Sequence, residues 1–168
     1  SFGARSFSVW DAVGNLVYDS GDDFEQITAM EYPDDFNSNN DENDSFESRS
    51  DNKGPEPEAI TIAEYDGVPY AFIGLERIGG VMIYDMSDPR TPEFVTYFNN
   101  RDFSVSDVET GSVGDLGPES ITFISEADSP NGDALLVVAN EVSGTVSIFT
   151  FGETATSVNH IASQERTW

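Results

Sequence analysis

The chain has 168 residues, of which 38% are hydrophobic, so it carries enough apolar side chain to build a core and is not expected to be disordered as a whole. Its 32 Asp and Glu against seven Lys and Arg give a formal net charge of -25, which repels nucleic-acid phosphates and anionic lipid headgroups and favours divalent cations or high salt. The absence of Cys excludes disulfides and thiolate metal sites, and no stretch approaches the roughly 20 apolar residues that a membrane-spanning helix needs.

The first segment, residues 5–31, is predicted to form a β-hairpin followed by a short helix. Alternating apolar runs at 6–10 and 16–18 flank Gly14-Asn15, a dipeptide typical of hairpin turns. A helix is expected at about 22–31, because apolar residues there share one helical face and a proline follows them: Phe24, Ile27, Met30 and Pro33.

A long acidic loop is predicted at 33–58, and a loop of this length is normally either functional or disordered. The segment 59–98 then contains short apolar runs separated by Gly and Pro, which predicts four antiparallel strands at 59–62, 70–75, 81–84 and 93–97. Four short strands in about 40 residues match the size of one propeller blade. Beyond it we expect a loop, a second blade and a polar tail, at 99–117, 118–152 and 153–168.

An internal repeat supports this division of the chain. Residues 57–62 match 118–123 at an offset of 61 residues, and residues 74–84 match 139–149 at an offset of 65. The four additional residues fall in the turn around 128–132, where a duplicated strand unit tolerates insertions.

The predicted fold class is therefore all-β: a partial β-propeller of two to three four-stranded blades, with one short helix and long acidic loops. Since a propeller needs about four to eight blades, we expect the chain to be a segment of a larger domain. The expected partner is the remainder of the parent propeller, in the same or another chain. A β-sandwich built from the same strands is the alternative.

Several segments resemble the bacterial choice-of-anchor I family, and together they cover nearly the whole chain: 6–11, 14–25, 43–46, 49–58, 71–77, 117–119 and 137–145. The resemblance implies the C-terminal part of a propeller in an exported protein that is secreted, periplasmic or at the cell surface. Some members are labelled alkaline phosphatase-like or esterase-like phytase, through kinship with calcium-dependent propeller phosphatases and phytases. The resemblance does not establish the reaction.

The candidate metal ligands are acidic residues at equivalent places in the repeat. Three Glu follow a Pro at the start of a strand and two lie at matching strand ends, so that in a propeller they would converge and repel one another without a cation. We predict a Ca²⁺ site from these five and one loop residue: Glu56, Glu58, Glu76, Glu119, Glu141 and Asp51. Alternatively, the acids cap strands and form ion pairs with the nearby cations. The acidic loop does not fit an EF-hand, because Phe46 stands at the sixth position, where Gly is required.

Three of the seven cations lie beside these acids: Arg49, Lys53 and Arg77. They would either clamp a phosphate group together with a metal or simply form salt bridges. A Ser-His-Asp triad would depend on His160, the single His. The leading hypothesis is a calcium-binding propeller module of an exported or surface protein. The alternative is a calcium-dependent phosphoester hydrolase that acts on a phosphorylated small molecule, and a third class is a pure interaction scaffold.

Overall fold

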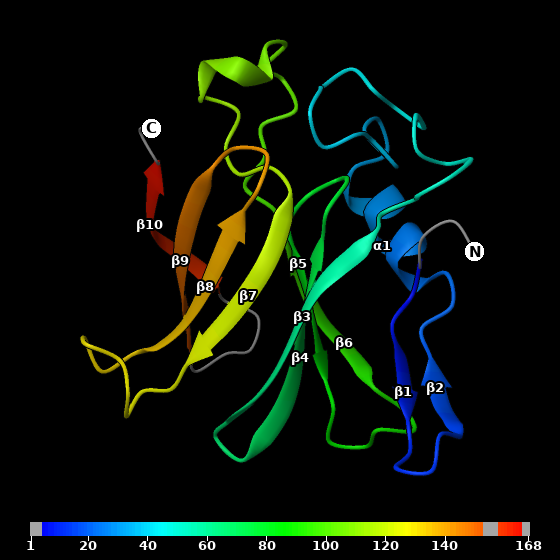
Figure 1. Ribbon diagram of the computed structural model, residues 1–168, viewed down its shortest axis with the longest axis vertical. Helices are drawn as coiled ribbons and strands as arrows, with labels where there is room; N and C mark the ends of the chain where they lie inside the picture. The colour runs from blue at the N-terminus through cyan, green and yellow to red at the C-terminus, as the bar shows by residue number, and fades with distance from the viewer. Residues whose placement is uncertain (1–4, 153–157, 166–168) are drawn as a thin grey trace.

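The computed structural model describes residues 5–152 and 158–165, which form three small antiparallel sheets and one α-helix (Figure 1). The elements in chain order are β1 (Ser8–Trp10), β2 (Leu16–Asp19), α1 (Asp23–Glu31), β3 (Pro57–Tyr65), β4 (Val68–Leu75), β5 (Val81–Asp85), β6 (Glu93–Phe98), the 3₁₀ turn η1 (Val108–Thr110), β7 (Pro118–Ile124), β8 (Ala134–Asn140), β9 (Thr145–Phe151) and β10 (Val158–Glu165). The prediction of an all-β chain with one short helix is confirmed.

The three sheets follow the chain order without crossovers. β1 and β2 form the N-terminal hairpin, β3 to β6 form the middle sheet, and β7 to β10 form the C-terminal sheet. The turn between β3 and β4 has positive φ at both Asp66 and Gly67, as in the two-residue turns whose twist suits a hairpin. Within the described residues the sheets do not close into a barrel or a ring.

The repeat found in the sequence is also a repeat of backbone pairing. The register between the first two strands shifts at Glu58 in the middle sheet and at Glu119 in the C-terminal sheet, so each Glu occupies a β-bulge. Each sheet end is closed by equivalent hydrogen bonds, from Glu76 N to Glu56 O at 2.9 Å and from Glu141 N to Gly117 O at 2.7 Å. The two four-stranded sheets are therefore copies of one unit.

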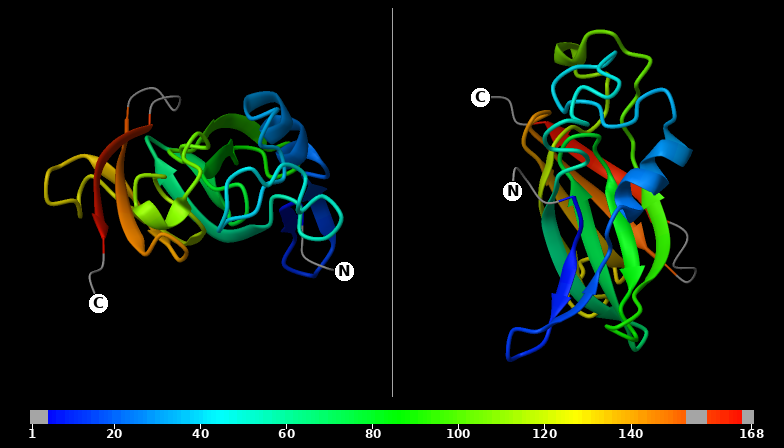
Figure 2. Two further views of the ribbon diagram at one scale, coloured as in Figure 1. Left: turned by 90° about the horizontal axis from the view of Figure 1, so that it is seen from above. Right: turned by 90° about the vertical axis from the view of Figure 1, so that its right-hand side faces the viewer.

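The middle sheet is covered on both faces, as the view from above shows (Figure 2). Alternate residues of β4 point to opposite sides, so Phe72 packs towards the C-terminal sheet and Ile73 packs towards the hairpin and α1. Phe72 stacks on Phe123 with a centroid distance of 5.5 Å. Gly74 allows the two sheets to approach closely, because a Cβ there would lie 3.2 Å from Pro118 and 3.3 Å from Ile121.

The helix begins and ends close to the predicted bounds, but its buried face differs from the expected one. Phe24 is fully buried as predicted, whereas Met30 is 73% exposed and Thr28 is buried in its place. α1 is short and covers only one end of the hairpin face, so its last turn extends beyond the core (Figure 2).

The prediction of a polar tail was wrong for residues 158–165, which form β10 and pair with β9 along the edge of the C-terminal sheet. The rest of the predicted tail lies outside the described residues. The strand was missed because its polar sequence lacks the alternating apolar residues that indicate a half-buried strand. In the part of the chain that the structure describes, no helix has the length and apolar character to cross a membrane.

The packing between the sheets predicts a large cost for truncating Phe72, which is fully buried and contacts the rings of Phe123 and Phe151. Phe72→Ala should lower the free energy of unfolding by about 3–5 kcal/mol, because a cavity remains between the sheets. Ile60→Ala, at a side chain that is 56% exposed, should cost less than about 1 kcal/mol. Urea denaturation of both variants measures the difference, and similar losses would contradict the described packing.

Candidate metal centre

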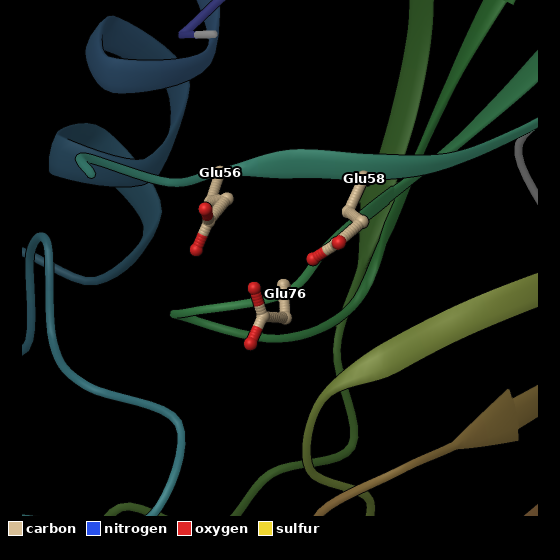
Figure 3. A group of neighbouring side chains, drawn as sticks. All are labelled: Glu56, Glu58 and Glu76. Carbon is tan, nitrogen blue, oxygen red and sulfur yellow. The ribbon is translucent and has the colours of Figure 1, made fainter. Parts of the chain in front are cut away.

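Three carboxylates meet at one end of the middle sheet: Glu56, Glu58 and Glu76 (Figure 3). Glu56 directly precedes β3, Glu58 occupies the bulge of β3, and Glu76 follows the end of β4. The hydrogen bond from Glu76 N to Glu56 O fixes the two chain segments, and one carboxylate oxygen of each residue lies within 4.8 Å of the other two. Glu56 and Glu76 are buried, and Glu58 is exposed.

Glu56 adopts a backbone conformation that is unfavourable for its residue type. Its φ is +50°, in the left-handed region, where a residue with a Cβ is strained. The equivalent residue of the C-terminal sheet is Gly117, with φ +70°. The backbone geometry of the repeat thus requires a left-handed residue here, and the middle sheet places a carboxylate where glycine would be less strained. Strain of this kind concentrates at functional sites.

Two cations compensate much of the negative charge. Lys53 Nζ forms an ion pair with Glu56 Oε1, and Arg77 Nε donates to Glu56 Oε2 at 2.6 Å. Arg77 Nη2 lies 3.2 Å from Glu76 Oε1, while Arg77 Nη1 donates to Asn40 Oδ1 at 2.9 Å. Asn40 Nδ2 in turn donates to Glu76 Oε1 at 2.7 Å. All three nitrogens of the Arg77 guanidinium therefore have partners within the centre.

A shared proton accounts for the remaining balance of charge. Burial, followed by contact with the Glu56 and Glu58 carboxylates, raises the pKa of Glu76 to about 8. Burial alone would also raise the pKa of Glu56, but hydrogen bonds from Glu76, Lys53 and Arg77 lower it to about 2. The pair therefore holds one proton at neutral pH, on Glu76, and Glu56 accepts a hydrogen bond from it.

Arg101 holds the acidic loop against this centre. It is 5% exposed, and its guanidinium donates to Asn43 Oδ1 at 2.8 Å and to the carbonyl oxygens of Asn39, Glu42 and Arg77 at 2.8–3.1 Å. These printed acceptors are all neutral, and burial lowers the pKa of Arg101 to about 10, which leaves it charged at neutral pH. The Arg101 contacts fix the loop on both sides of Asn40, whose amide then reaches Glu76.

The sequence did not indicate the role of Arg101. Its acceptors are backbone carbonyls and one amide side chain, so no pattern of opposite charges marks it. The position of Glu56 did carry a signal, since Gly117 at the matching place of the repeat indicates a left-handed backbone.

The structure brings together five of the nine residues proposed from the sequence: Lys53, Glu56, Glu58, Glu76 and Arg77. Arg49 lies outside the centre and donates from Nε to Asn39 Oδ1 at 2.7 Å. Asp51 is exposed on the loop and is not part of the three-carboxylate group. The backbone of His160 lies in β10, and its side chain is outside the described part of the chain.

Glu119 and Glu141 form a second acidic pair at the equivalent end of the C-terminal sheet. Both are exposed and line one shallow depression, and the pKa of Glu119 is raised by limited burial and then by the charges of Glu58 and Glu141. This pair is therefore a neighbour of Glu58 but does not join the three-carboxylate group. Val142 stands where the first unit has Arg77, so the second pair lacks the equivalent cation.

The donor set suits a hard divalent cation. Three carboxylates supply at least three of the six to eight oxygens that Ca²⁺ takes, and water can supply the rest. A bound cation would compete with the proton on Glu76 and with Lys53, whose side chain is 38% exposed and can move into solvent. Arg77 is more deeply enclosed, with 17% of its side chain exposed.

Comparison with known proteins bears on the segment that carries this centre. Residues 1–89 match the family model described as the choice-of-anchor I domain, a range that includes all three carboxylates. The chain is also similar to Gigasin-3a of Magallana gigas, with 33% identity over 159 residues, covering 89% of this chain and 56% of the relative. It thus spans about half the length of that relative. No solved structure matches the chain.

The raised pKa of Glu76 predicts a loss of stability with rising pH. A carboxyl whose pKa is higher in the folded than in the unfolded chain stabilises the fold most at low pH, and this contribution disappears as the pH rises from about 5 through 8. In a chelator-treated sample, the unfolding free energy should therefore fall across this range, and Glu76→Gln should reduce the fall. Urea denaturation at several pH values tests this, and parallel curves for the two proteins would contradict it. The low pKa of Glu56 acts only below about pH 4.5 and does not interfere.

Replacing Arg101 should release the acidic loop. Arg101→Gln should lower the free energy of unfolding by about 2–4 kcal/mol, because buried acceptors lose their donors. Amide hydrogen exchange at 39–43 should become faster at the same time. Arg90→Gln, at an exposed residue of the β5–β6 connection, is the matched control and should change neither quantity. Unchanged exchange in the Arg101 variant would show that the loop is held in another way.

Proposed function

Because the chain belongs to the choice-of-anchor I domain family, we propose that it is a calcium-binding module of an extracellular, cell-surface protein and forms part of a β-propeller. The observation that carries the proposal is the position of Glu56. Its strained left-handed backbone brings a buried carboxylate against Glu76 and Glu58, at a cost that a purely structural contact does not explain.

The chemistry of the centre favours Ca²⁺ among the common metal ions. The ligands are oxygen atoms from carboxylates, which hard cations prefer, whereas Zn²⁺ sites usually draw on Cys and His. The chain has no Cys and one His. Mg²⁺ requires near-ideal octahedral geometry, while Ca²⁺ accepts the irregular arrangement of one strand bulge and two strand ends. A cation that replaces the proton of Glu76 would relieve the repulsion among the three carboxylates.

The propeller part of the proposal is supported by the packing of the sheets. Two copies of one four-stranded unit pack face to face with the same bulges and the same closing hydrogen bonds. Radial stacking of such units gives a propeller. Since this chain spans 56% of Gigasin-3a, a relative of this kind has room for further units, which the same or another chain would supply here.

The geometry favours cation binding over hydrolysis of a phosphoester. A phosphate clamp needs free donors, but all three guanidinium nitrogens of Arg77 are engaged within the centre. Lys53 alone has the exposure to meet an incoming phosphate group. A calcium-dependent phosphoester hydrolase therefore remains the alternative function, and a phosphatase assay with and without Ca²⁺ separates the two.

Calcium titration tests the binding proposal directly. Ca²⁺ should raise the melting temperature of the chelator-treated chain, because a ligand at about 100 times its Kd stabilises the fold by about 2.7 kcal/mol. Glu58→Gln should abolish the rise without harming the fold, since Glu58 is exposed. Glu64→Gln, at another exposed residue of β3, should leave it intact.

The same titration should depend on pH. Ca²⁺ competes with the proton on Glu76, so calorimetry should give tighter binding at pH 8 than at pH 6, with proton release on binding at the lower pH. No thermal shift with Ca²⁺, or an equal shift in Glu58→Gln, would refute the proposed site.

A further inference from the structure

The N-terminal hairpin is built like the second half of each complete sheet. The register between the paired strands shifts at Val9/Trp10 in β1, at Ile83/Tyr84 in β5 and at Ile148/Phe149 in β9. The side chains of the hairpin also point the same way: Phe7 and Val9 pack on the middle sheet, as Val81 and Ile83 pack towards the C-terminal sheet. The hairpin thus corresponds to the last two strands of the repeated unit, without the first two.

An apolar groove lies where the absent strands would stand. It has a volume of about 340 Å³ and is lined mainly by six residues: Phe7, Val9, Trp10, Ile60, Ile62 and Met86. The groove continues from the buried contact between the hairpin and the middle sheet, to which Phe7 and Val9 belong. In the view from the side, β1 crosses in front of the middle sheet without a further strand beside it (Figure 2).

The exposed residues of this groove have buried equivalents in the next unit. Ile60 and Ile62 are 56% and 58% exposed on β3. The offset of 61 residues makes them equivalent to Ile121, which is 7% exposed, and to Phe123, which is partly buried. Those two residues are covered by the first two strands of the preceding sheet, where Phe72 stacks on Phe123. Ile60 and Ile62 lack cover because the hairpin lacks those two strands.

We propose that this groove binds a pair of antiparallel β-strands, one of which pairs with the open edge of β1 while their apolar face covers Ile60 and Ile62. The occupant is the first half of a repeat unit with an apolar or aromatic face like that of β3 and β4. It comes from the parent protein beyond this chain, which spans 56% of its relative Gigasin-3a. The inference rests on the stacked-unit architecture proposed above and is independent of the cation centre.

The test adds the nearest available equivalent of the absent strands to the full chain. A second copy of residues 57–74 is fused directly before Ser1, because the 74 residues that separate Val9 from Ile83 then keep the spacing of the repeat. The chain has no Cys, so Ile62→Cys introduces a single thiol as a reporter of exposure. We expect its labelling by a maleimide to slow by about tenfold or more in the extended chain, as for a group that becomes buried.

Two controls make the result specific. Val13→Cys, at a hairpin-turn residue that is 83% exposed, should label at the same rate in both chains. Replacing Tyr70 and Phe72 by Lys within the added copy alone should restore fast labelling of the Ile62→Cys variant. Amide exchange in β1 should slow only in the extended chain with the native copy, which reports strand pairing independently of the thiol.

Two outcomes would overturn the inference. The first is equal labelling of the Ile62→Cys variant in the extended and unextended chains. The second is protection in the unextended chain that grows with protein concentration, since the occupant would then be a second copy. Calcium titration of the same extended chain keeps the questions separate, because the three carboxylates of the metal centre do not line the groove.

Discussion

The repulsion among three carboxylates at one end of the middle sheet is the constraint that organises this region. Glu56 and Glu76 are both buried, and their charges could not coexist there without compensation. The chain supplies a proton, the Arg77 guanidinium and the Lys53 ammonium. The surrounding architecture serves this balance: the acidic loop delivers Asn40 to Glu76, and Arg101 holds that loop in place.

Duplication of the sheet unit explains where the centre lies, and divergence explains why it occurs in one unit. Both units place a Glu in a bulge at the start of the first strand and another at the end of the second. Only the first unit adds Glu56 in the left-handed position and Arg77 after the strand end, where the second has Gly117 and Val142. A shared backbone frame was therefore adapted into a compensated, buried site in the middle sheet and left as an exposed acidic pair in the other.

The sequence allowed the sheets and three of the six proposed metal ligands to be predicted, because these depend on local patterns. Gly and Pro separate the apolar runs, and the offsets of 61 and 65 residues reveal the duplication. The sequence could not separate Glu119 and Glu141 from the other Glu residues, since their distance depends on how one sheet packs on the next. Arg101 was missed because it recognises neutral carbonyl groups, and β10 because polar residues form it.

The two proposals meet in β3, which begins at the metal centre and continues along the groove. Glu58 lies in the bulge of this strand, while Ile60 and Ile62 follow it on the part that lacks cover. β3 forms one edge of the middle sheet and has β4 as its paired neighbour, so strands packed over Ile60 and Ile62 would restrict its motion. Fixing a ligand in its bound position reduces the entropy that binding must lose. The complete assembly should therefore hold Glu58 more rigidly beside Glu56 and Glu76 than this chain does alone, and the cation centre should gain affinity as the parent fold is completed.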